Sequence, residues 1–407
     1  MRRIGVLSLG NFFAAAHFFL IIYILAPYLA TLVPENVAGL AISLGAVFTL
    51  TFFPSLPRLA AKYGPQKLGV WFGFAEILIL LGLALSPNAF FAVLLAALAC
   101  AVSPFIAYQL DLLLESAVED ENSTGRVRAA FLTAGNVSLV LAPMVTGYLL
   151  ADSERYNLVF LVAALSLIPF MLLLRHVPAA IPAPPRRINL RDACLCLMND
   201  KDLRAIALAY GVIQFFFHLA PLYIPLYLHN VLGIPWSELG WMFAVMLLPF
   251  VLLEYPAGWL ADTKLGDKRI LAAGFVLTGL ALAAIGTITE TTSLTAILAI
   301  LVLSRVGSAL VEAIAEGHFF RRVSANDANT VSLFRMLRPV GALTAPIVGS
   351  LLLSVSGYTT FFAVTGFFVL VVGFFASLSV RDLRHAAQTT DLETPPLPPS
   401  GAPKGRG

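Results

Sequence analysis

Two histidines of this chain stand deep inside long apolar stretches, where they could carry protons or contact a ligand. His17 lies thirteen residues into the first stretch and His218 fourteen residues into the seventh, which is about 20 Å along a helix at 1.5 Å per residue. Imidazole titrates near neutral pH and can hold a proton while it bonds a ligand. The pair therefore predicts a substrate or proton site. The alternative is that each ring only bonds a neighbouring helix.

Polar side chains around His218 repeat at the spacing of a helix. Tyr210, Gln214 and His218 follow at intervals of four residues, so they share one face of a helix. Tyr108 heads a comparable polar stripe in an earlier apolar stretch. We expect Tyr108, Tyr210 and Gln214 to belong to the same candidate site as the two histidines.

Arg305 is the most unusual basic residue, because it stands well inside an apolar stretch that later carries Glu312 and Glu316. At 100° per residue the three side chains lie within about 40° of each other around a helix. An arginine above two carboxylates could bind an anionic group or hold a proton-labile acid. The alternative is an internal salt bridge or a gate. We favour a cavity role for Arg305 and Glu312 and a gating role for Glu316.

Glu76 interrupts the apolar stretch WFGFAEILILLG and has no counterpart in the second half of the sequence. Ionisable residues at such positions are costly and usually functional. Glu76 is either a proton-titratable acid or a carboxyl group bonded to the preceding apolar stretch, and the second alternative is slightly favoured.

The composition shows which elements must position these residues. Of the 407 residues 59% are hydrophobic and 12% charged, with a mean hydropathy of +0.87, whereas a soluble domain carries about 25% charged residues. Most of the surface must therefore face lipid, and the continuous apolar runs favour membrane helices over a β-barrel. The runs predict twelve spans, at 4–30, 36–57, 68–86, 89–117, 128–151, 157–175, 204–229, 236–261, 269–288, 293–319, 330–355 and 358–379.

The longest polar connection divides these spans six and six. We expect a six-helix bundle at 1–175, a linker at 176–203, a second bundle at 204–380 and a disordered Pro-rich tail at 381–407. Connections on one side hold 22 of the 26 Lys and Arg residues, those on the other side hold Arg155 alone, and three lie within spans. The positive-inside rule then predicts that both termini, the linker and the tail are cytoplasmic.

Landmarks in the first half recur in the second half at a constant offset of 201 to 203 residues: His17 and His218, Gly64 and Gly266, Pro143 and Pro346, and Asp111 with Glu115 against Glu312 with Glu316. Such self-similarity indicates a duplicated unit. Because six spans bring the chain back to the same side, the two copies have the same orientation and are related by an axis along the membrane normal.

A polar loop between the eighth and ninth spans, GWLADTKLGDKR, resembles the signature loop of the major facilitator superfamily. Its matching residues are Gly258, Leu260, Ala261, Asp262, Gly266, Lys268 and Arg269. The first-half copy, RLAAKYGPQK, departs from the pattern, because Pro57 replaces the leading Gly and Ala61 the Asp. The resemblance implies an all-α membrane protein with two six-helix bundles related by a pseudo-two-fold axis, in which spans 1, 4, 7 and 10 line a central cavity.

In that family the signature loop lies at the cytoplasmic seam between the halves, which rock against each other. The resemblance implies that Gly258 allows close helix approach and that Asp262 lies at the start of span eleven or pairs with a nearby base. Lys268 and Arg269 could then reach Glu312, Glu316 or Glu254 as a gating latch, although these bases could also be only a topology signal. The remaining seam candidates are Arg58, Lys62, Gly64, Gly266, Asp111 and Glu115.

The expected function is secondary active transport by alternating access, as proton-coupled export of amphipathic or drug-like molecules. Proton-coupled uptake of a small, anionic metabolite is the alternative, and a non-transporting membrane sensor is the alternative from another class. No phosphate-binding loop and no intramembrane catalytic motif such as H-E-x-x-H is present, so we expect no enzyme activity, cofactor or metal. The expected partners are a small-molecule substrate, protons and lipid, with no nucleic acid, for a monomer in the cell's inner (plasma) membrane.

Overall fold

The computed structural model describes residues 2–85, 88–117, 124–151, 154–177, 190–323 and 328–381. Every regular element in these ranges is a helix. Twelve helical segments are long and apolar enough to cross a membrane, from Arg3–Ala30 to Tyr358–Ser379. The twelve predicted spans are confirmed, and their predicted bounds differ from the observed ones by a few residues. The predicted tail and most of the predicted linker lie outside the described residues.

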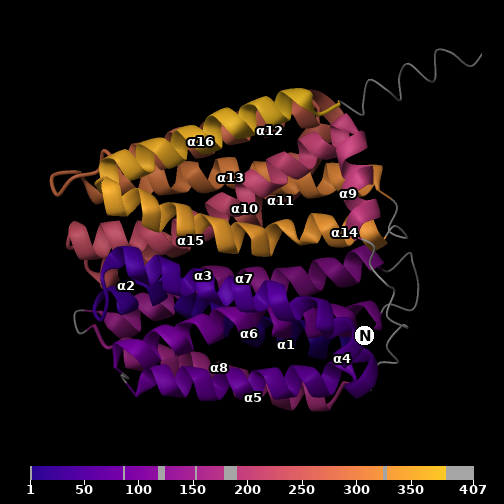
Figure 1. Ribbon diagram of the computed structural model, residues 1–407, viewed down its shortest axis with the longest axis vertical. Helices are drawn as coiled ribbons and strands as arrows, with labels where there is room; N and C mark the ends of the chain where they lie inside the picture. The colour runs from indigo at the N-terminus through magenta and orange to yellow at the C-terminus, as the bar shows by residue number, and fades with distance from the viewer. Residues whose placement is uncertain are drawn as a thin grey trace, which may run out of the picture.

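The helices form two layers, which we call the first half (residues 2–177) and the second half (residues 201–381) (Figure 1). The first half contains α1 (Arg2–Ile22), α2 (Leu25–Ala30), α3 (Glu35–Phe52), η1 (Phe53–Ser55), α4 (Leu56–Tyr63), α5 (Pro65–Ala84), α6 (Ala89–Glu115), α7 (Thr124–Leu150) and α8 (Tyr156–Arg175). The second half contains α10 (Lys201–Pro225), η3 (Leu226–Val231), α11 (Trp236–Leu260), η4 (Ala261–Leu265), α12 (Asp267–Ile285), α13 (Leu294–Arg322), α14 (Ala328–Arg335), α15 (Leu337–Val355) and α16 (Tyr358–Ser379). Between them, α9 (Leu190–Asn199) packs against α10 and α14.

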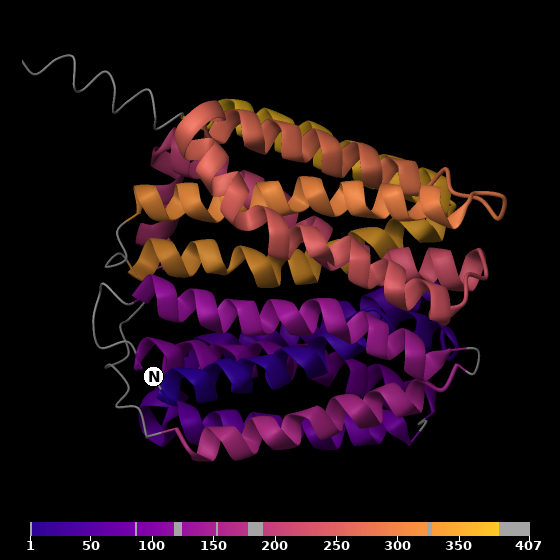
Figure 2. The ribbon, with the colours of Figure 1, turned by 180° about the vertical axis from the view of Figure 1, so that it is seen from behind.

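Within each half the long helices pack side by side. In the first half α1 lies against α7 and α8, and α5 lies against α6 and α8. In the second half α12 lies against α13 and α16, and α10 against α15. Across the junction α7 packs on α11 and α3 on α15, as the view from behind also shows for α7 and α11 (Figure 2). These two crossings join the halves.

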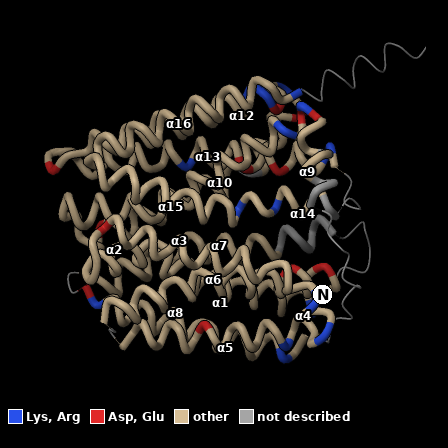
Figure 3. The backbone as a smooth tube through the Cα atoms, viewed as in Figure 1, with Lys and Arg blue, Asp and Glu red and all other residues tan. Residues whose placement is uncertain are grey.

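Lys, Arg, Asp and Glu residues are concentrated at one end of the bundle, near the N terminus, α4, α9 and α14 (Figure 3). We call this the charged end, and we call the end at which α2 lies the opposite end. Between the two ends the outer surface is apolar: Trp71, Phe74 and Leu78 follow one face of α5 and are each more than half exposed. Such an exposed apolar face is what a helix in contact with lipid presents.

Local sequence explains where several helices begin. Asn88 and Ser293 accept hydrogen bonds from the backbone N–H groups of Phe91 and Ala296, and so cap α6 and α13. Gly64 and Gly266 have φ values of 85° and 78°, which other residues adopt only with strain. Each glycine ends one span and directly precedes the next, α5 or α12. These matching turns agree with the predicted duplication.

Candidate functional site

A buried polar group inside the first half joins α1, α5 and α6. The Nε2 atom of His17 lies 3.2 Å from the hydroxyl oxygen of Ser103, and this hydroxyl donates to Glu76 Oε1 at 3.4 Å. His17 Nε2 is 4.0 Å from the same carboxylate oxygen. Both ionisable side chains are almost completely buried, at 2% and 0% exposed. We call His17 and Glu76 the His17–Glu76 pair, and Ser103 its bridging serine.

The expectation that Glu76 bonds to the second span is therefore wrong. Its partner, Ser103, lies in the fourth span, because α5 packs along α6. Glu76 Oε2 has no hydrogen-bond partner in the part of the chain that the structure describes, and no Lys or Arg described here lies within 4.0 Å of Glu76. Lipid does not tolerate a lone buried charge. In this conformation the pair is therefore most stable when it holds one labile proton and is neutral overall.

Arg305, on α13, lies where the two halves meet. The side chain is 2% exposed, and its Cζ atom lies 4.8 Å from the centre of the Phe216 ring on α10. Its guanidinium lies beside the hydroxyl group of Tyr23, between α1 and α2. The Tyr23 ring in turn stacks on Phe243 of α11 at 5.1 Å. Arg305 thus contacts aromatic residues of both halves.

Glu312 and Glu316 do not pair with Arg305, so the expected arrangement of an arginine above two carboxylates is wrong. Both lie against Arg338 of α15, whose Nη2 atom is 4.0 Å from Glu312 Oε1 and 2.6 Å from Glu316 Oε1. Tyr210 donates to Glu316 at 2.9 Å and accepts from Arg338 Nε at 2.6 Å. We call these four residues the Arg338 cluster. Arg338 is absent from the sequence-based candidates, and its carboxylate partners on α13 were expected to contact Lys268 or Arg269.

His218 has a different environment from His17. Its Nδ1 atom lies 2.8 Å from the backbone carbonyl oxygen of Gln214 on the same helix, and the side chain is half-buried. Tyr210, on the same face, stacks on Phe334 with ring centres 4.2 Å apart. The structure therefore gives the two predicted cavity histidines separate partners.

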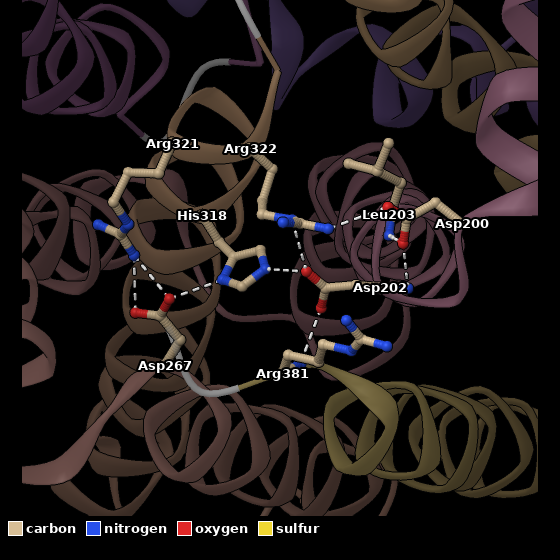
Figure 4. Close-up of polar contacts among 8 residues, drawn as sticks. All are labelled: Asp200, Asp202, Leu203, Asp267, His318, Arg321, Arg322 and Arg381. Atoms are coloured by element: carbon tan, nitrogen blue, oxygen red, sulfur yellow. Dashed lines mark hydrogen bonds and ion pairs between the residues drawn. The ribbon is translucent and has the colours of Figure 1, made fainter. Parts of the chain in front are cut away.

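The signature loop is held within the second half by a second cluster at the charged end (Figure 4). Asp267 accepts hydrogen bonds from Arg321 at 2.6 and 2.8 Å, and its Oδ2 atom is 2.6 Å from His318 Nδ1. Asp262 lies 3.5 Å from Arg321. Of the two positions expected for Asp262, this conformation has the contact with a nearby base, Arg321.

The other side of His318 faces the start of α10. His318 Nε2 is 3.0 Å from Asp202 Oδ2, and Asp202 also accepts from the backbone N–H of Arg381, beyond α16 (Figure 4). Arg322 contacts Asp200 at 2.9 Å and Asp202 at 3.1 Å. We call His318 with its aspartate and arginine partners the His318 cluster. It joins four segments of one half, and sequence analysis did not single out His318.

Gly258 differs from its expected role. A methyl group built on Gly258 would meet no atom within 4 Å among the described residues, so this glycine makes no close helix contact here. Lys264 of the same loop lies over the Trp259 ring at 5.3 Å. In this conformation the loop is therefore attached to its own half, and its leading glycine is uncrowded.

At the opposite end, glycines of the two halves lie in close contact with the other half. We call this contact the glycine junction. A methyl group on Gly147 of α7 would lie 2.7 Å from the Cα atom of Gly240 of α11. Gly39 of α3 lies just as closely against Ser350 of α15 and Tyr223 of α10. Glu35 also accepts a hydrogen bond from Tyr358. The two halves are therefore in backbone contact at this end, as close small-residue packing in membranes allows.

The first-half seam candidates lie at the charged end as expected. Arg58 and Lys62 are exposed on α4, and Lys62 lies 4.9 Å from the Tyr63 ring. Asp111 and Glu115 are exposed in the last turns of α6, and Tyr108 packs its ring edge against Phe53 at 5.4 Å.

Comparison with known proteins agrees with this architecture. A family model described as Major Facilitator Superfamily matches residues 205–402. A curated relative, the multidrug resistance protein MdtG of Dickeya zeae (strain Ech586), is 26% identical over 407 residues, which cover 96% of this chain and 98% of the relative.

Solved transporters share the fold. The nucleoside transporter NupG superposes with a TM-score of 0.75 at 14% identity, covering 93% of this chain and 99% of that one. The peptide transporter PepTSo of the POT family superposes with a TM-score of 0.73 at 16% identity, covering 97% and 99%. With twelve helices that are long and apolar enough to cross a membrane, the chain is an integral membrane protein whose second half matches the Major Facilitator Superfamily model and whose fold is shared with solved transporters.

Proposed function

We propose that this transporter exports amphipathic small molecules in exchange for protons, by alternating access between its two halves. The observation that carries the proposal is the difference between the two ends. The glycine junction brings the halves into backbone contact at the opposite end, whereas Gly258 of the signature loop is uncrowded at the charged end. The described conformation is therefore the state in which the halves are closed at the opposite end. The second state closes the charged end by packing the signature loop across the seam.

The Lys and Arg distribution supports assigning the charged end to the cytoplasm. In this orientation both termini are cytoplasmic, and the described conformation faces inward. The proposed domains are the bundles at 1–175 and 204–380, joined by the linker at 176–203 and followed by the tail at 381–407. We propose that the protein works as a monomer in the inner membrane, since each chain holds both halves of the pathway.

The His17–Glu76 pair supports proton coupling. A carboxyl and an imidazole share one labile proton in a region without a compensating Lys or Arg within 4.0 Å among the described residues. Cys100 on α6 is also close enough to interact electrostatically with Glu76. Apart from Glu76 itself, α1, α5, α6 and α8 carry their charged residues near their ends. Opening of the halves would let water reach the pair and exchange this proton.

Two observations support export of amphipathic compounds. The relative that aligns over nearly the full length is named a multidrug resistance protein. Aromatic rings also gather where the halves meet, with Tyr23 stacked on Phe243 and Phe216 beside Arg305. Uptake of a small anionic metabolite is the second candidate, because Arg305 lacks a carboxylate partner within 4.0 Å among the described residues.

The test is transport by purified protein in liposomes with an imposed pH gradient. Ethidium, Nile red and 1-anilinonaphthalene-8-sulfonate provide a cationic, a neutral and an anionic amphiphile, and a trapped pH dye reports protons. We expect at least one amphiphile to move against the direction of proton flux, and a protonophore to abolish this movement. Movement in the same direction as protons would establish uptake instead. If no amphiphile and no protons move, the proposal fails.

A further inference from the structure

We propose that Arg305 is an anion-binding residue and that the transported substrates carry a carboxylate or a similarly flat anionic group on an apolar body. The proposal rests on the proposed transport function and names the chemical class of its substrates. It starts from the hydrogen-bonding state of one buried side chain at the junction of the two halves.

Arg305 is a buried cation without a counter-charge among the described residues. A guanidinium stays protonated in proteins and offers five N–H donors. Arg305 is 2% exposed, yet no Asp or Glu in the described residues lies within 4.0 Å of it. Its partners are a phenol, Tyr23, and the face of a phenyl ring, Phe216. Neither partner carries the negative charge that a buried cation normally requires.

One edge of the Arg305 guanidinium is free to bind a ligand. The Nε and Nη2 atoms of Arg305 are buried and have no hydrogen-bond partner in the described part of the structure. These two nitrogens direct their hydrogens along the same edge of the guanidinium. This edge is one of those that bind a carboxylate through two parallel hydrogen bonds. The unused donors are therefore a matched pair.

Hydroxyl groups near Arg305 do not offer a substitute. Ser304 donates to the carbonyl oxygen of Leu301 at 2.6 Å, and Ser308 donates to the carbonyl oxygen of Arg305 itself at 3.2 Å. Both hydroxyls are thus bonded to their own helix. An incoming anion is the partner that would satisfy the free edge.

The surrounding rings indicate what the rest of the ligand resembles. Phe216 lies against the guanidinium, and Tyr23 and Phe243 form a stacked pair whose planes differ by 30°. Aromatic surfaces favour an apolar or aromatic body. Because Tyr23 belongs to the first half and Arg305 to the second, a ligand at this place contacts both halves and responds to their movement.

Three probes with one ring system and different charges test the proposal: 2-naphthoate, 2-naphthamide and 2-naphthylmethylammonium. Each is added to the detergent-purified full chain at neutral pH, and the midpoint of thermal unfolding is measured. Binding to the folded state raises this midpoint. We expect naphthoate to raise it and the neutral and cationic probes to leave it unchanged.

Substitutions of Arg305 test whether the naphthoate-induced shift in the unfolding midpoint depends on this residue. Arg305→Gln should abolish the naphthoate shift. Arg305→Lys keeps the charge but loses the two parallel N–H donors, and it should weaken naphthoate binding about tenfold. The matched control is Arg175→Gln, at an exposed arginine in the last turn of α8, which should keep the full shift. The unfolding midpoint of each variant without ligand confirms that it is folded, and circular dichroism provides a second check.

Two results would overturn the inference: an equal shift with the neutral or cationic probe, or a full naphthoate shift in folded Arg305→Gln. Failure of the site is distinguishable from failure of the transport function. If neutral amphiphiles are exported in a pH-dependent way without Arg305, the function stands and the anion site falls. If naphthoate binding needs Arg305 but no amphiphile is exported, the site stands and the export function falls.

Discussion

His17 and His218 occupy equivalent positions in the two halves of the molecule, 201 residues apart, but their surroundings have diverged. His17 is completely buried beside Ser103 and Glu76, whereas His218 is half-buried and contacts only a backbone carbonyl among the partners described for it. The first half thus holds its buried acid near mid-membrane. The second half holds a lone buried arginine there and concentrates its carboxylates at the charged end.

The two halves also differ in how the charged end is organised. In the second half, the His318 and Arg338 clusters connect α10, α12, α13 and α15. In the first half, the corresponding α4 and α6 residues Arg58, Lys62 and Glu115 are exposed. This difference indicates that the two halves kept the same helices and turns after duplication, whereas their polar residues diverged. On our account the first half binds the coupling proton, and the second half binds the substrate and fixes the signature loop.

The largest expected effect comes from removing the proton site of the first half. Glu76→Gln keeps the shape of the side chain but cannot release a proton, so substrate movement driven by a pH gradient should fall to background. Exchange of labelled for unlabelled substrate without a gradient should persist. Both are measured in proteoliposomes. The matched control is Glu290→Gln in an exposed loop; gradient-driven transport by Glu76→Gln at the wild-type rate would remove the coupling role.

Removal of the histidine from the His318 cluster should have the next largest effect, on stability. His318→Ala leaves two buried carboxylates, Asp202 and Asp267, without their shared partner, which should cost about 3 kcal/mol. His218→Ala is the matched change at a histidine without a carboxylate partner among its described contacts, and it should cost less than about 1 kcal/mol. Denaturant unfolding measures both. Equal losses would show that the second half does not depend on this cluster.

The glycine junction provides the third comparison. Gly147→Leu places a side chain where Gly240 lies, and overpacking of this kind costs about 1–3 kcal/mol. The state closed at the opposite end should therefore lose population about fivefold or more. A cysteine at Ser350, in a chain whose three native cysteines are replaced by serine, should then react faster with an impermeant maleimide. Gly5→Leu, with no neighbour within 4 Å, should leave the labelling rate unchanged; if it has the same effect, the junction is not a gate.

The smallest expected effect concerns the Arg338 cluster. Arg338 is 53% exposed, so its ion pairs with Glu316 and Glu312 contribute about 1 kcal/mol at most. Arg338→Gln should change the transport rate by about fivefold, whereas the same change at Arg335, three residues earlier, should leave it nearly unchanged. An identical effect of both substitutions would indicate that overall charge at this end, and not the cluster, sets the rate.

Much of the fold follows from sequence, because the signals that specify it are local. Apolar runs are as long as the membrane is thick, which predicts all twelve spans. The polar turns at Gly64 and Gly266 recur at a fixed offset, which predicts the duplication. The partners of individual polar residues are harder to predict, because they depend on how each helix is rotated against its neighbours.

Glu76 illustrates this limit. Its position in α5 is clear from sequence, but its partner depends on α5 packing along α6 and α8, which the sequence does not specify. Arg338 and Glu316 are 22 residues apart and meet because α13 and α15 both pack against α10. The position of His318 within its span could have identified it from the sequence. It lies at the same end of its span as Asp202 and Asp267, which begin two other spans.

We infer that the two halves move against each other and that the described state is open at the charged end. Spin labels at Lys62 and Lys264, exposed and equivalent in the two halves, report the distance between the halves at this end by pulsed electron resonance. Our account predicts a long distance in the wild-type background and a shift to a shorter one in Gly147→Leu, which destabilises the junction at the other end. The same distance distribution in both proteins would contradict the account.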